Sequence, residues 1–478
     1  MHSLIPALLL ALLQAVNTPL QSQSFNWFIE RLNALPTAER QAVADSFMQS
    51  AGRFPYTEAD TVAHFVFDQS AASVAVAGDH TGWEPDRPMT RVDGTTFWYL
   101  TEVFPSDARL DYKYVVNGFN WILDPKNPHT CMGGFGPNSE LRMPHYTFPQ
   151  EIAYNPAIPH GTLTDTLFYS PALQNSRTVK VYLPPGYPAG RDAYPVIVFH
   201  DGPEYFSLGN AVNILDNLVA GSLMAPVIAL FVPPVNRTEE YAGNRMDQFT
   251  TFIVSELMPA IDSRYKTSRD PSLRAMAGAS NGGNIALYIS MRHPEAFGLV
   301  AAQSSNIIPV ITDTFTQSHR LPLNVYLDIG MYDIPFLVPV VEGFRSILAD
   351  KGYPHEFHRW SEGHSWGSWK GHLRLPLVRF FPVTAGTTEP PAGSPGKLHQ
   401  NRPNPFRGQT VIPCSAIPGE NIELTLFDSA GRKLGAIFSG RTEQPMKISY
   451  IHRHPPGSYI LTLTSGKGYR ESILITAE

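Results

Sequence analysis

The chain has little cysteine, no run of basic residues and almost no long apolar segment. Its 478 residues include two cysteines, Cys131 and Cys414, and no cysteine or histidine spacing typical of a zinc site. The net charge is −6, and no basic stretch of the kind found in nucleic-acid-binding proteins occurs. These absences argue against a disulfide framework, a metal site and a nucleic-acid partner. The length and a hydrophobic content of 43% predict several domains with buried cores.

One apolar run lies at the start of the chain, over residues 4–16. It has the length of a signal peptide and is too short to cross a bilayer. The residues before it include no lysine or arginine, so a buried N-terminal helix is the alternative. We expect a signal peptide over residues 1–24, export of the protein, and no membrane span in the mature chain.

The most informative motif is Gly-x-Ser-x-Gly at residues 278–282, centred on Ser280. Residues 273–277 before it fit a short buried strand, and residues 284–291 after it have apolar side chains at helical spacing. This order of strand, serine and helix is typical of a nucleophile elbow, in which glycines let the strand and the helix approach closely. The alternative is a glycine-rich turn with a solvated serine.

A serine hydroxyl needs a base to become a nucleophile, and the base needs an acid to orient it. Asp333 lies just past a strand-like run, and His364 lies in a loop beside Gly363 and Trp366. Serine, acid and histidine in this chain order are typical of α/β-hydrolases. The sequence therefore predicts a catalytic triad of Ser280, Asp333 and His364.

Four other residues compete for these roles. Asp328 is an alternative acid, although it lies inside the strand-like run, and Glu362 is another, although it is only two residues from His364. His355 and His358 are alternative bases, although a histidine within a strand is more often structural.

The tetrahedral intermediate of ester hydrolysis also needs backbone N–H donors aimed at its oxyanion. One is expected from Asn281, the residue after the nucleophile. The second is expected from the loop after the strand at residues 194–199, where Pro203 has no N–H. Gly202 is therefore the predicted second donor, and Glu204 is the alternative.

Residues 162–382 resemble the esterase D and enterochelin-esterase-like branch of the α/β-hydrolases, which also contains feruloyl and acetyl-xylan esterases. The matching segments, besides the elbow, are residues 181–187, 200–206, 236–241, 252–261, 292–298 and 363–366. The resemblance implies an α/β-hydrolase fold, the triad named above, and no metal or organic cofactor. Pro203 departs from the pattern, because relatives often carry a residue with an N–H there.

Residues 59–116 change to an alternating pattern with turn signals, which predicts a small β-sandwich. Residues 78–83, 112–114 and 117–125 resemble the glycogen-binding and isoamylase-N-terminal class of carbohydrate modules. In such modules two tryptophans stack on sugar rings while a lysine and an asparagine bind hydroxyls. The matching positions are Trp83, Trp121, Lys113 and Asn138. The alternative is a sandwich that only docks on the hydrolase and shapes its cleft.

The last part of the chain follows a linker-like segment rich in proline, glycine and threonine at residues 386–396. Residues 400–406 and the strand-like segments after them resemble the C-terminal sorting domain of bacterial type IX secretion. The resemblance implies secretion machinery as a partner and a secreted or cell-surface location. An ordinary accessory β-domain is the alternative.

We therefore predict an α/β-hydrolase flanked by two β-domains that hydrolyses carboxylic esters, feruloyl or acetyl, on a carbohydrate or plant-wall polymer. The alternatives are a siderophore esterase and a carbohydrate-binding surface protein with an inactive hydrolase domain. Tyr205, Phe206, Tyr332 and Trp366 are the predicted aromatic lining of the acyl pocket. The predicted parts are a signal peptide (1–24), a helical extension (25–56), a β-sandwich (57–146), the esterase domain (159–382), a linker (383–397) and the sorting-like domain (398–478).

Overall fold

The computed structural model describes residues 24–189 and 191–383 and, further on, 397–398, 401, 403–415, 421–428, 432–441, 446–465 and 470–477. The predicted signal peptide lies outside the described residues except for residue 24. The predicted linker lies outside them except for residues 383 and 397. The chain divides into two compact units, one ending at residue 384 and the other beginning at residue 385. None of the described helices combines the length and apolar character needed to cross a membrane.

Two helices open the described chain, α2 (Phe25–Ala34) and α3 (Thr37–Ser50). The Ser24 side chain caps α2 by accepting a hydrogen bond from the Trp27 backbone N–H at 3.2 Å. The buried faces of both helices form one apolar cluster with Val66 and Phe97 of the following sheet. The helical extension is thus packed on the sandwich.

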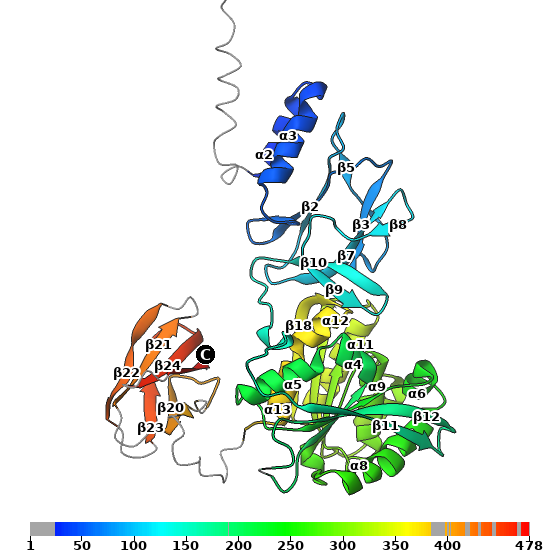
Figure 1. Ribbon diagram of the computed structural model, residues 1–478, viewed down its shortest axis with the longest axis vertical. Helices are drawn as coiled ribbons and strands as arrows, with labels where there is room; N and C mark the ends of the chain where they lie inside the picture. Colours follow the sequence, from blue (N-terminus) through cyan, green and yellow to red (C-terminus); the bar gives the residue numbers. More distant parts are fainter. Residues whose placement is uncertain are drawn as a thin grey trace, which may run out of the picture. The chain divides into compact units, whose positions relative to one another are not determined.

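The sandwich has two facing sheets (Figure 1). Its core is formed by the inward side chains of alternate positions, among them Phe65, Phe67, Tyr112 and Tyr114. The first sheet has the order β1 (Tyr56–Glu58), β2 (Val62–Phe67), β6 (Trp98–Val103), β5 (Thr90–Arg91). The second contains β3 (Val74–Gly78), β4 (Arg87–Pro88), β7 (Arg109–Val116), β8 (Asn120–Ile122), β10 (Gly136–Arg142) and β9 (Thr130–Gly133), with the short helix η3 (Asp79–Thr81) after β3.

The hydrolase domain is built on an eight-stranded sheet in which the first two strands are antiparallel to their neighbours and the others run parallel. Alternate residues of the central strand β13 (Val196–His200) enter cores on opposite faces, Val196 and Val198 on one and Ile197 and Phe199 on the other. Burial on both faces explains why such strands are apolar throughout. The order is β11 (Thr162–Ser170), β12 (Asn175–Leu183), β14 (Ile228–Val232), β13 (Val196–His200), β15 (Arg274–Ala279), β16 (Leu299–Gln303), β17 (Asn324–Tyr332), β18 (His355–Gly363).

Helices cover both faces of this sheet. One face carries α4 (Gly202–Ser207), α5 (Ala211–Ala220), α12 (Trp366–His372) and α13 (Arg374–Phe380). The other carries α6 (Arg237–Ala242), α7 (Met246–Thr251), the π-helix η5 (Phe252–Leu257), α8 (Met258–Arg264), α9 (Asn281–Arg292), α10 (Pro309–Gln317) and α11 (Leu337–Asp350). Two single-turn helices, η4 (Gln150–Ile152) and η6 (Pro271–Leu273), lie in the connections.

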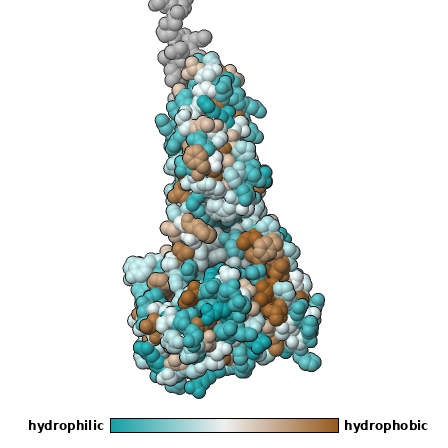
Figure 2. All heavy atoms as spheres, turned by 90° about the vertical axis from the view of Figure 1, so that its right-hand side faces the viewer, coloured by the Kyte–Doolittle hydropathy of each residue, from teal (hydrophilic) through white to brown (hydrophobic). Residues whose placement is uncertain are grey.

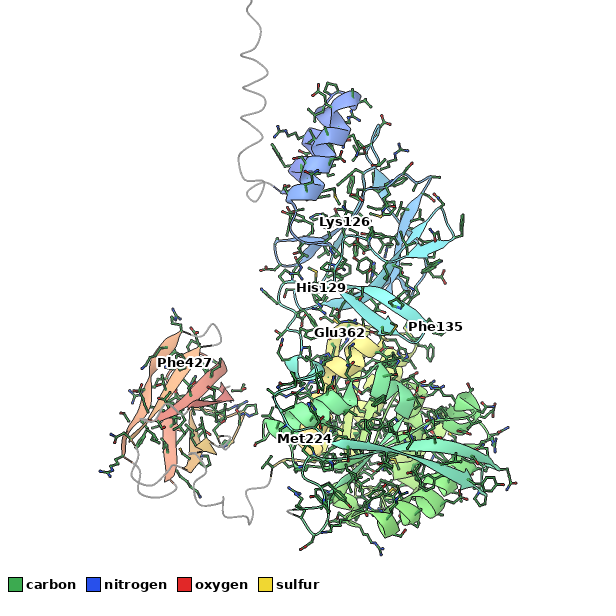
Figure 3. The ribbon with its side chains drawn as sticks, in the orientation of Figure 1. Lys126, His129, Phe135, Met224, Glu362 and Phe427 are labelled. Atoms are coloured by element: carbon green, nitrogen blue, oxygen red, sulfur yellow. The ribbon has the colours of Figure 1, made fainter. Side chains whose placement is uncertain are left out.

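The sandwich and the hydrolase share a continuous sheet. Glu362 of β18 pairs in parallel with Arg109 of β7, which joins the hydrolase sheet to the second sheet of the sandwich. Figure 3 places Glu362 at this junction and Phe135 in the turn between β9 and β10. The sandwich therefore contacts the hydrolase where the last strand of its sheet ends.

The C-terminal unit consists of strands around its own core, which includes Phe406, Cys414, Leu424 and Leu461. Cys131 and Cys414 are buried in different units. One sheet has the order β19 (Lys397–Leu398), β20 (Gln409–Ser415), β23 (Met446–Ile451). The other has the order β22 (Lys433–Arg441), β21 (Asn421–Asp428), β24 (Gly457–Ser465), β25 (Arg470–Ala477).

Candidate active site

Ser280 lies in a sharp turn between β15 and α9, with φ 56° and ψ −124°. This backbone conformation is costly for a residue with a side chain and is found mainly at functional sites. The turn also brings the strand end against the helix start. A Cβ added to Gly278 would lie 2.2 Å from the backbone carbon of Gly282, so only glycine fits there. The strand, turn and helix expected around Ser280 are all present.

Asp333 and His364 follow the neighbouring strands β17 and β18 and are hydrogen-bonded to each other. His364 Nδ1 donates to Asp333 Oδ1 at 2.7 Å, and the same carboxylate oxygen accepts the Ile334 backbone N–H at 2.7 Å. The Asp333 side chain is fully buried, whereas the His364 side chain is 19% exposed. Because Nδ1 faces the carboxylate, Nε2 is the ring nitrogen left for a substrate-side proton.

A short chain of contacts connects the serine turn to the histidine loop. The Ser280 backbone N–H donates to the carbonyl of Gln303 at the end of β16. The next residue, Ser304, accepts a hydrogen bond from Trp369 Nε1 at 3.0 Å, and the Trp369 ring stands edge-on to the His364 ring at 4.9 Å. Ser280, Asp333 and His364 thus lie at the carboxyl ends of β15, β17 and β18, the edge where α/β sheets hold their sites.

The alternative acids have other partners. Asp328 accepts hydrogen bonds from Gln303 Nε2 at 3.2 Å and from the Tyr326 hydroxyl at 3.1 Å, and burial raises its pKa. Glu362 accepts a hydrogen bond from His372 Nε2 at 2.7 Å. Neither carboxylate bonds to His364 within the described part of the chain.

The alternative bases are also engaged elsewhere. His355 and His358 both lie in β18, as the sequence pattern predicted. His355 Nδ1 donates to the Tyr353 carbonyl at 3.0 Å, and His358 Nε2 donates to Glu356 at 2.6 Å. These contacts favour structural roles for both.

The two predicted oxyanion donors are the first residues of two helices. Asn281 begins α9 and Gly202 begins α4, and the first N–H groups of a helix have no acceptor within it. The Glu204 N–H is already donated to the carbonyl of Asp201 at 3.1 Å. Gly202 is therefore the better candidate of the two residues considered for the second donor.

Arg237 holds the loop that carries Gly202, a role that the sequence analysis missed. Its guanidinium forms two hydrogen bonds of 2.8 Å to the Asp201 carboxylate and a longer one of 3.4 Å to the carbonyl of Ala279. The ion pair thus connects the oxyanion loop to the residue before the nucleophile. Arg237 lies in a segment of the family resemblance, but 36 residues of sequence separate it from Asp201.

The predicted aromatic lining divides into buried and accessible members. Tyr205 is 1% exposed, with its hydroxyl bonded to Gln303, and Trp366 is 8% exposed in the same core. Both pack inside the domain, so we leave them out of the proposed substrate surface. Phe206 is 37% exposed, and Tyr332 is half-buried against the sandwich.

Other apolar side chains are exposed beside the strand ends. Met331, Ile334 and Phe336 flank Asp333, and Val310 lies in the helix that follows β16. Figure 2 shows apolar side chains gathered on the hydrolase domain below its junction with the sandwich. This edge of the sheet therefore offers open apolar surface.

The four predicted sugar-binding residues lie on or near the outer face of the second sandwich sheet. Trp121 is 42% exposed and pairs with Val115, two positions along β7 from Lys113. Trp83 Nε1 donates to Asp79 at 3.2 Å, and Asn138 Nδ2 donates to Asp111 at 3.1 Å. Trp121 and Lys113 thus have the more available polar and aromatic surface. No cluster of metal-ligating side chains occurs among the residues that the structure describes.

A family model described as "Putative esterase" matches residues 170–379, the segment that contains the serine turn and the histidine loop. Residues 170–379 are thus similar to the members of that family. The sandwich and the C-terminal unit lie outside this match.

Two curated relatives and one solved structure are also similar to this chain. The chain is 27% identical over 271 residues to an endo-1,4-beta-xylanase/feruloyl esterase of Xylanibacter ruminicola, covering 54% of this chain and 36% of that protein. It is 25% identical over 256 residues to an iron(III) enterobactin esterase of Escherichia coli, covering 48% and 62%. It thus spans less than two-thirds of either relative.

The crystal structure of ferric enterobactin esterase from Salmonella typhimurium has the same fold. Its TM-score is 0.59 at 20% identity, covering 67% of this chain and 93% of that one. The fold is that of an α/β-hydrolase, and the matched part of the chain is similar to carboxylic ester hydrolases.

Proposed function

We propose that the protein is a secreted serine esterase that hydrolyses esters carried on a carbohydrate or plant-wall polymer. The observation that carries the proposal is the 2.7 Å hydrogen bond between Asp333 and His364, at the sheet edge where the strained Ser280 turn ends β15. A serine, a histidine and a buried carboxylate in this arrangement have the roles of a nucleophile, a base and an orienting acid.

In the proposed reaction, Ser280 Oγ attacks the ester carbonyl while its proton passes to His364 Nε2. Asp333 keeps Nδ1 protonated and stabilises the imidazolium that forms. The N–H groups of Asn281 and Gly202 stabilise the oxyanion. His364 then gives its proton to the leaving alcohol. It next takes a proton from water, which attacks the acyl-enzyme carbonyl. As the bond from the acyl carbon to Ser280 Oγ breaks, His364 returns that proton to Oγ, and the acid and free Ser280 are released.

The substrate class rests on two surfaces and one relative. Exposed Ile334 and Phe336 offer apolar contacts to an aromatic acyl group, and Trp121 with Lys113 offers a stacking and hydrogen-bonding surface to a sugar. The relative named as a xylanase/feruloyl esterase favours a plant-wall ester. A siderophore ester is the second candidate, favoured by the relative named as an iron(III) enterobactin esterase.

The catalytic assignment is tested by Ser280→Ala and Asp333→Asn on p-nitrophenyl acetate. We expect no turnover above background for Ser280→Ala and a fall in kcat of roughly 10⁴-fold for Asp333→Asn, which loses the tautomer control of His364. Asp328→Asn is the matched control, because it changes a second buried carboxylate in the same sheet. The kcat of Asp328→Asn is expected to stay within about tenfold of the wild-type value, because Asp328 bonds to Gln303 and not to His364. Equal rates for wild type and Ser280→Ala contradict the mechanism.

The substrate class is tested with methyl ferulate, acetylated xylan and a catecholate lactone. Hydrolysis of the lactone in preference to the other two favours the siderophore ester. Retention on xylan, glycogen and starch is measured with Trp121→Ala and Trp83→Ala. Unchanged retention of both variants removes sugar binding from the proposal.

We also propose that the C-terminal unit directs export through type IX secretion. Deleting residues 385–478 in a host with that system is expected to keep the esterase inside the outer membrane. Full export of the shortened chain contradicts this role.

A further inference from the structure

We propose that the sandwich is part of the catalytic apparatus, and that Arg109 is a positioning residue for the loop that carries His364. This inference rests on the proposed function, since it assigns a cause to the geometry of the same histidine. The sandwich would then act on ester hydrolysis itself, whether or not it binds a sugar.

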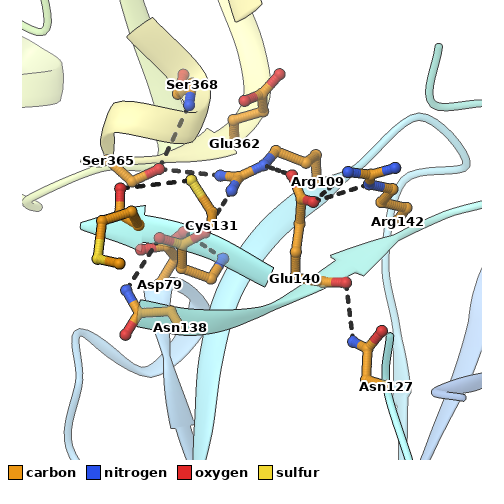
Figure 4. A network of polar contacts seen from close by, with 12 residues as sticks. Asp79, Arg109, Asn127, Cys131, Asn138, Glu140, Arg142, Glu362, Ser365 and Ser368 are labelled. Carbon is orange, nitrogen blue, oxygen red and sulfur yellow. Dashed lines mark hydrogen bonds and ion pairs between the residues drawn. The ribbon is translucent and has the colours of Figure 1, made fainter. Parts of the chain in front are cut away.

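Arg109 lies at the centre of a buried polar network between the two domains (Figure 4). It is fully buried, and its guanidinium reaches three acceptors. Nε pairs with Glu140 Oε1 at 2.5 Å and Nη2 with Asp111 Oδ1 at 2.5 Å, both within the sandwich. Nη1 donates to Ser365 Oγ of the hydrolase at 3.0 Å. Two carboxylates therefore orient the Arg109 guanidinium, and its third nitrogen points to the loop that carries His364.

Ser365 connects this charge to the start of α12. It follows His364 directly, and its side chain caps the helix by accepting the Ser368 N–H at 3.4 Å. The first turn of α12 also packs on the guanidinium, because a Cβ added to Gly367 would lie 2.0 Å from Arg109 Cζ. The residues just after His364 are thus held against a side chain of the sandwich.

The residue just before His364 is held by the sandwich as well. A Cβ added to Gly363 would lie 2.2 Å from Asp79 Cγ, so the carboxylate lies directly against the loop backbone. Asp79 is itself fixed, because its Oδ2 accepts the Asp111 N–H at 2.8 Å. His364 therefore lies between two points where the loop touches buried, hydrogen-bonded groups of the sandwich.

A buried ion-pair network is weak evidence for added stability, so we infer a role in geometry. Buried ion pairs lose much of their attraction to desolvation, and apolar replacements are often neutral or stabilising. A misplacement of about 1 Å at a catalytic group, in contrast, costs roughly 10²-fold in rate. We therefore expect Arg109 to affect the reaction rate, through the placement of His364, more than it affects stability.

The test compares Ser365→Ala, Arg109→Lys and the double variant. Ser365→Ala removes both the acceptor of Arg109 and the cap of α12, while Arg109 keeps its carboxylate partners, so we expect the fold to be retained. We expect kcat on p-nitrophenyl acetate to fall by about 10- to 100-fold, with KM changed less than about threefold. Ser365→Thr keeps the hydroxyl and is expected to restore kcat. The kcat of the double variant is expected to be no lower than that of the worse single variant, because both changes break the same contact, between Arg109 and Ser365.

Arg142→Gln is the matched control, since Arg142 pairs with the other oxygen of Glu140 at 2.8 Å without reaching Ser365. It is expected to lower Tm while kcat stays within about twofold. The rate at which a fluorophosphonate labels Ser280 is measured across pH for every variant. A shifted or flattened pH profile in Ser365→Ala and Arg109→Lys alone supports positioning of His364.

Wild-type kcat and labelling profiles in both Ser365→Ala and Arg109→Lys overturn the inference. So does an equal loss of kcat in Arg142→Gln and Arg109→Lys at equal loss of Tm, which assigns Arg109 a purely structural role. Both results leave the proposed function intact. Activity in Ser280→Ala overturns the proposed function instead, so the two failures are distinguishable.

Discussion

The two β-rich parts that flank the hydrolase domain differ in how they use their charged residues. In the sandwich, Arg109, Asp111 and Glu140 are buried and bond to one another and to the hydrolase. In the C-terminal unit, the neighbouring strands β22 and β21 carry Lys433 and Glu423, which meet at 2.9 Å with side chains 57% and 41% exposed. Exposed pairs contribute little, whereas buried ones impose geometry.

This difference matches the division of the chain into compact units. The sandwich and the hydrolase fall in one unit, and the C-terminal strands form the other. Domains that share buried polar contacts are expected to unfold and to act together, whereas separate units are expected to do neither. The comparison predicts that changes in the sandwich alter catalysis and that changes in the C-terminal unit do not.

The largest expected effect that sharpens this comparison is on stability. Phe104 is 4% exposed in the sandwich core, and its ring meets the Tyr332 ring edge-on at 6.2 Å, beside Asp333. Phe104→Ala is expected to lower the free energy of unfolding of the first unit by roughly 3–5 kcal/mol and to reduce kcat as well. Phe406→Ala, which empties a similar volume in the C-terminal core, is the matched control.

Chemical unfolding followed by two probes, one for each unit, measures this prediction together with turnover of p-nitrophenyl acetate. Phe406→Ala is expected to weaken the second transition alone and to leave kcat unchanged. If Phe406→Ala slows turnover as much as Phe104→Ala does, the contrast between the two parts is wrong.

The local features of the site could be predicted from the sequence. Ser280 is predictable because glycines and a strand-to-helix change mark its turn over a few residues. Asp333 and His364 are predictable as loop residues because each follows a strand-like run, and the structure brings them into hydrogen-bonding contact. Each of these signals extends over only a few neighbouring residues, so it can be recognised in a single sequence.

The long-range features could not be predicted. Arg109 and Ser365 are 256 residues apart, and no period or motif relates them. Charged residues at alternate positions of β7 indicate an outward face, but not which domain covers it. Tyr205 and Trp366 were predicted to line a pocket, yet aromatic residues serve a core equally well, and both are buried.

A smaller effect is expected from pH. Burial lowers the pKa of His200 to about 3, and its ring packs near Tyr241 and Phe249. In the unfolded chain the histidine pKa is about 6.5, so between pH 6.5 and about pH 3 this side chain is protonated in the unfolded state but neutral in the folded state. Acid therefore destabilises the folded state over this range. Between pH 6.5 and pH 4.5 this one residue is expected to lower the free energy of unfolding by about 2 kcal/mol.

His200→Leu is expected to remove that part of the acid sensitivity from the unfolding of the first unit. The transition of the C-terminal unit in the same protein is the internal control and is expected not to change. The measurement is the free energy of unfolding of wild type and variant at both pH values. An identical pH dependence in both proteins contradicts the assignment, and a change in both transitions contradicts the separation of the units.

The smallest effect is expected from removing the C-terminal unit altogether. Among the described residues, its core contains no residue of the hydrolase, and the partners given above for Asp333 and His364 are Ile334, Trp369 and each other. Deleting residues 385–478 is therefore expected to leave kcat/KM on p-nitrophenyl acetate within about twofold and the Tm of the first unit unchanged. A tenfold change in kcat/KM would mean that the C-terminal unit reaches the active site. In that case both β-rich parts, and not the sandwich alone, would be coupled to the chemistry.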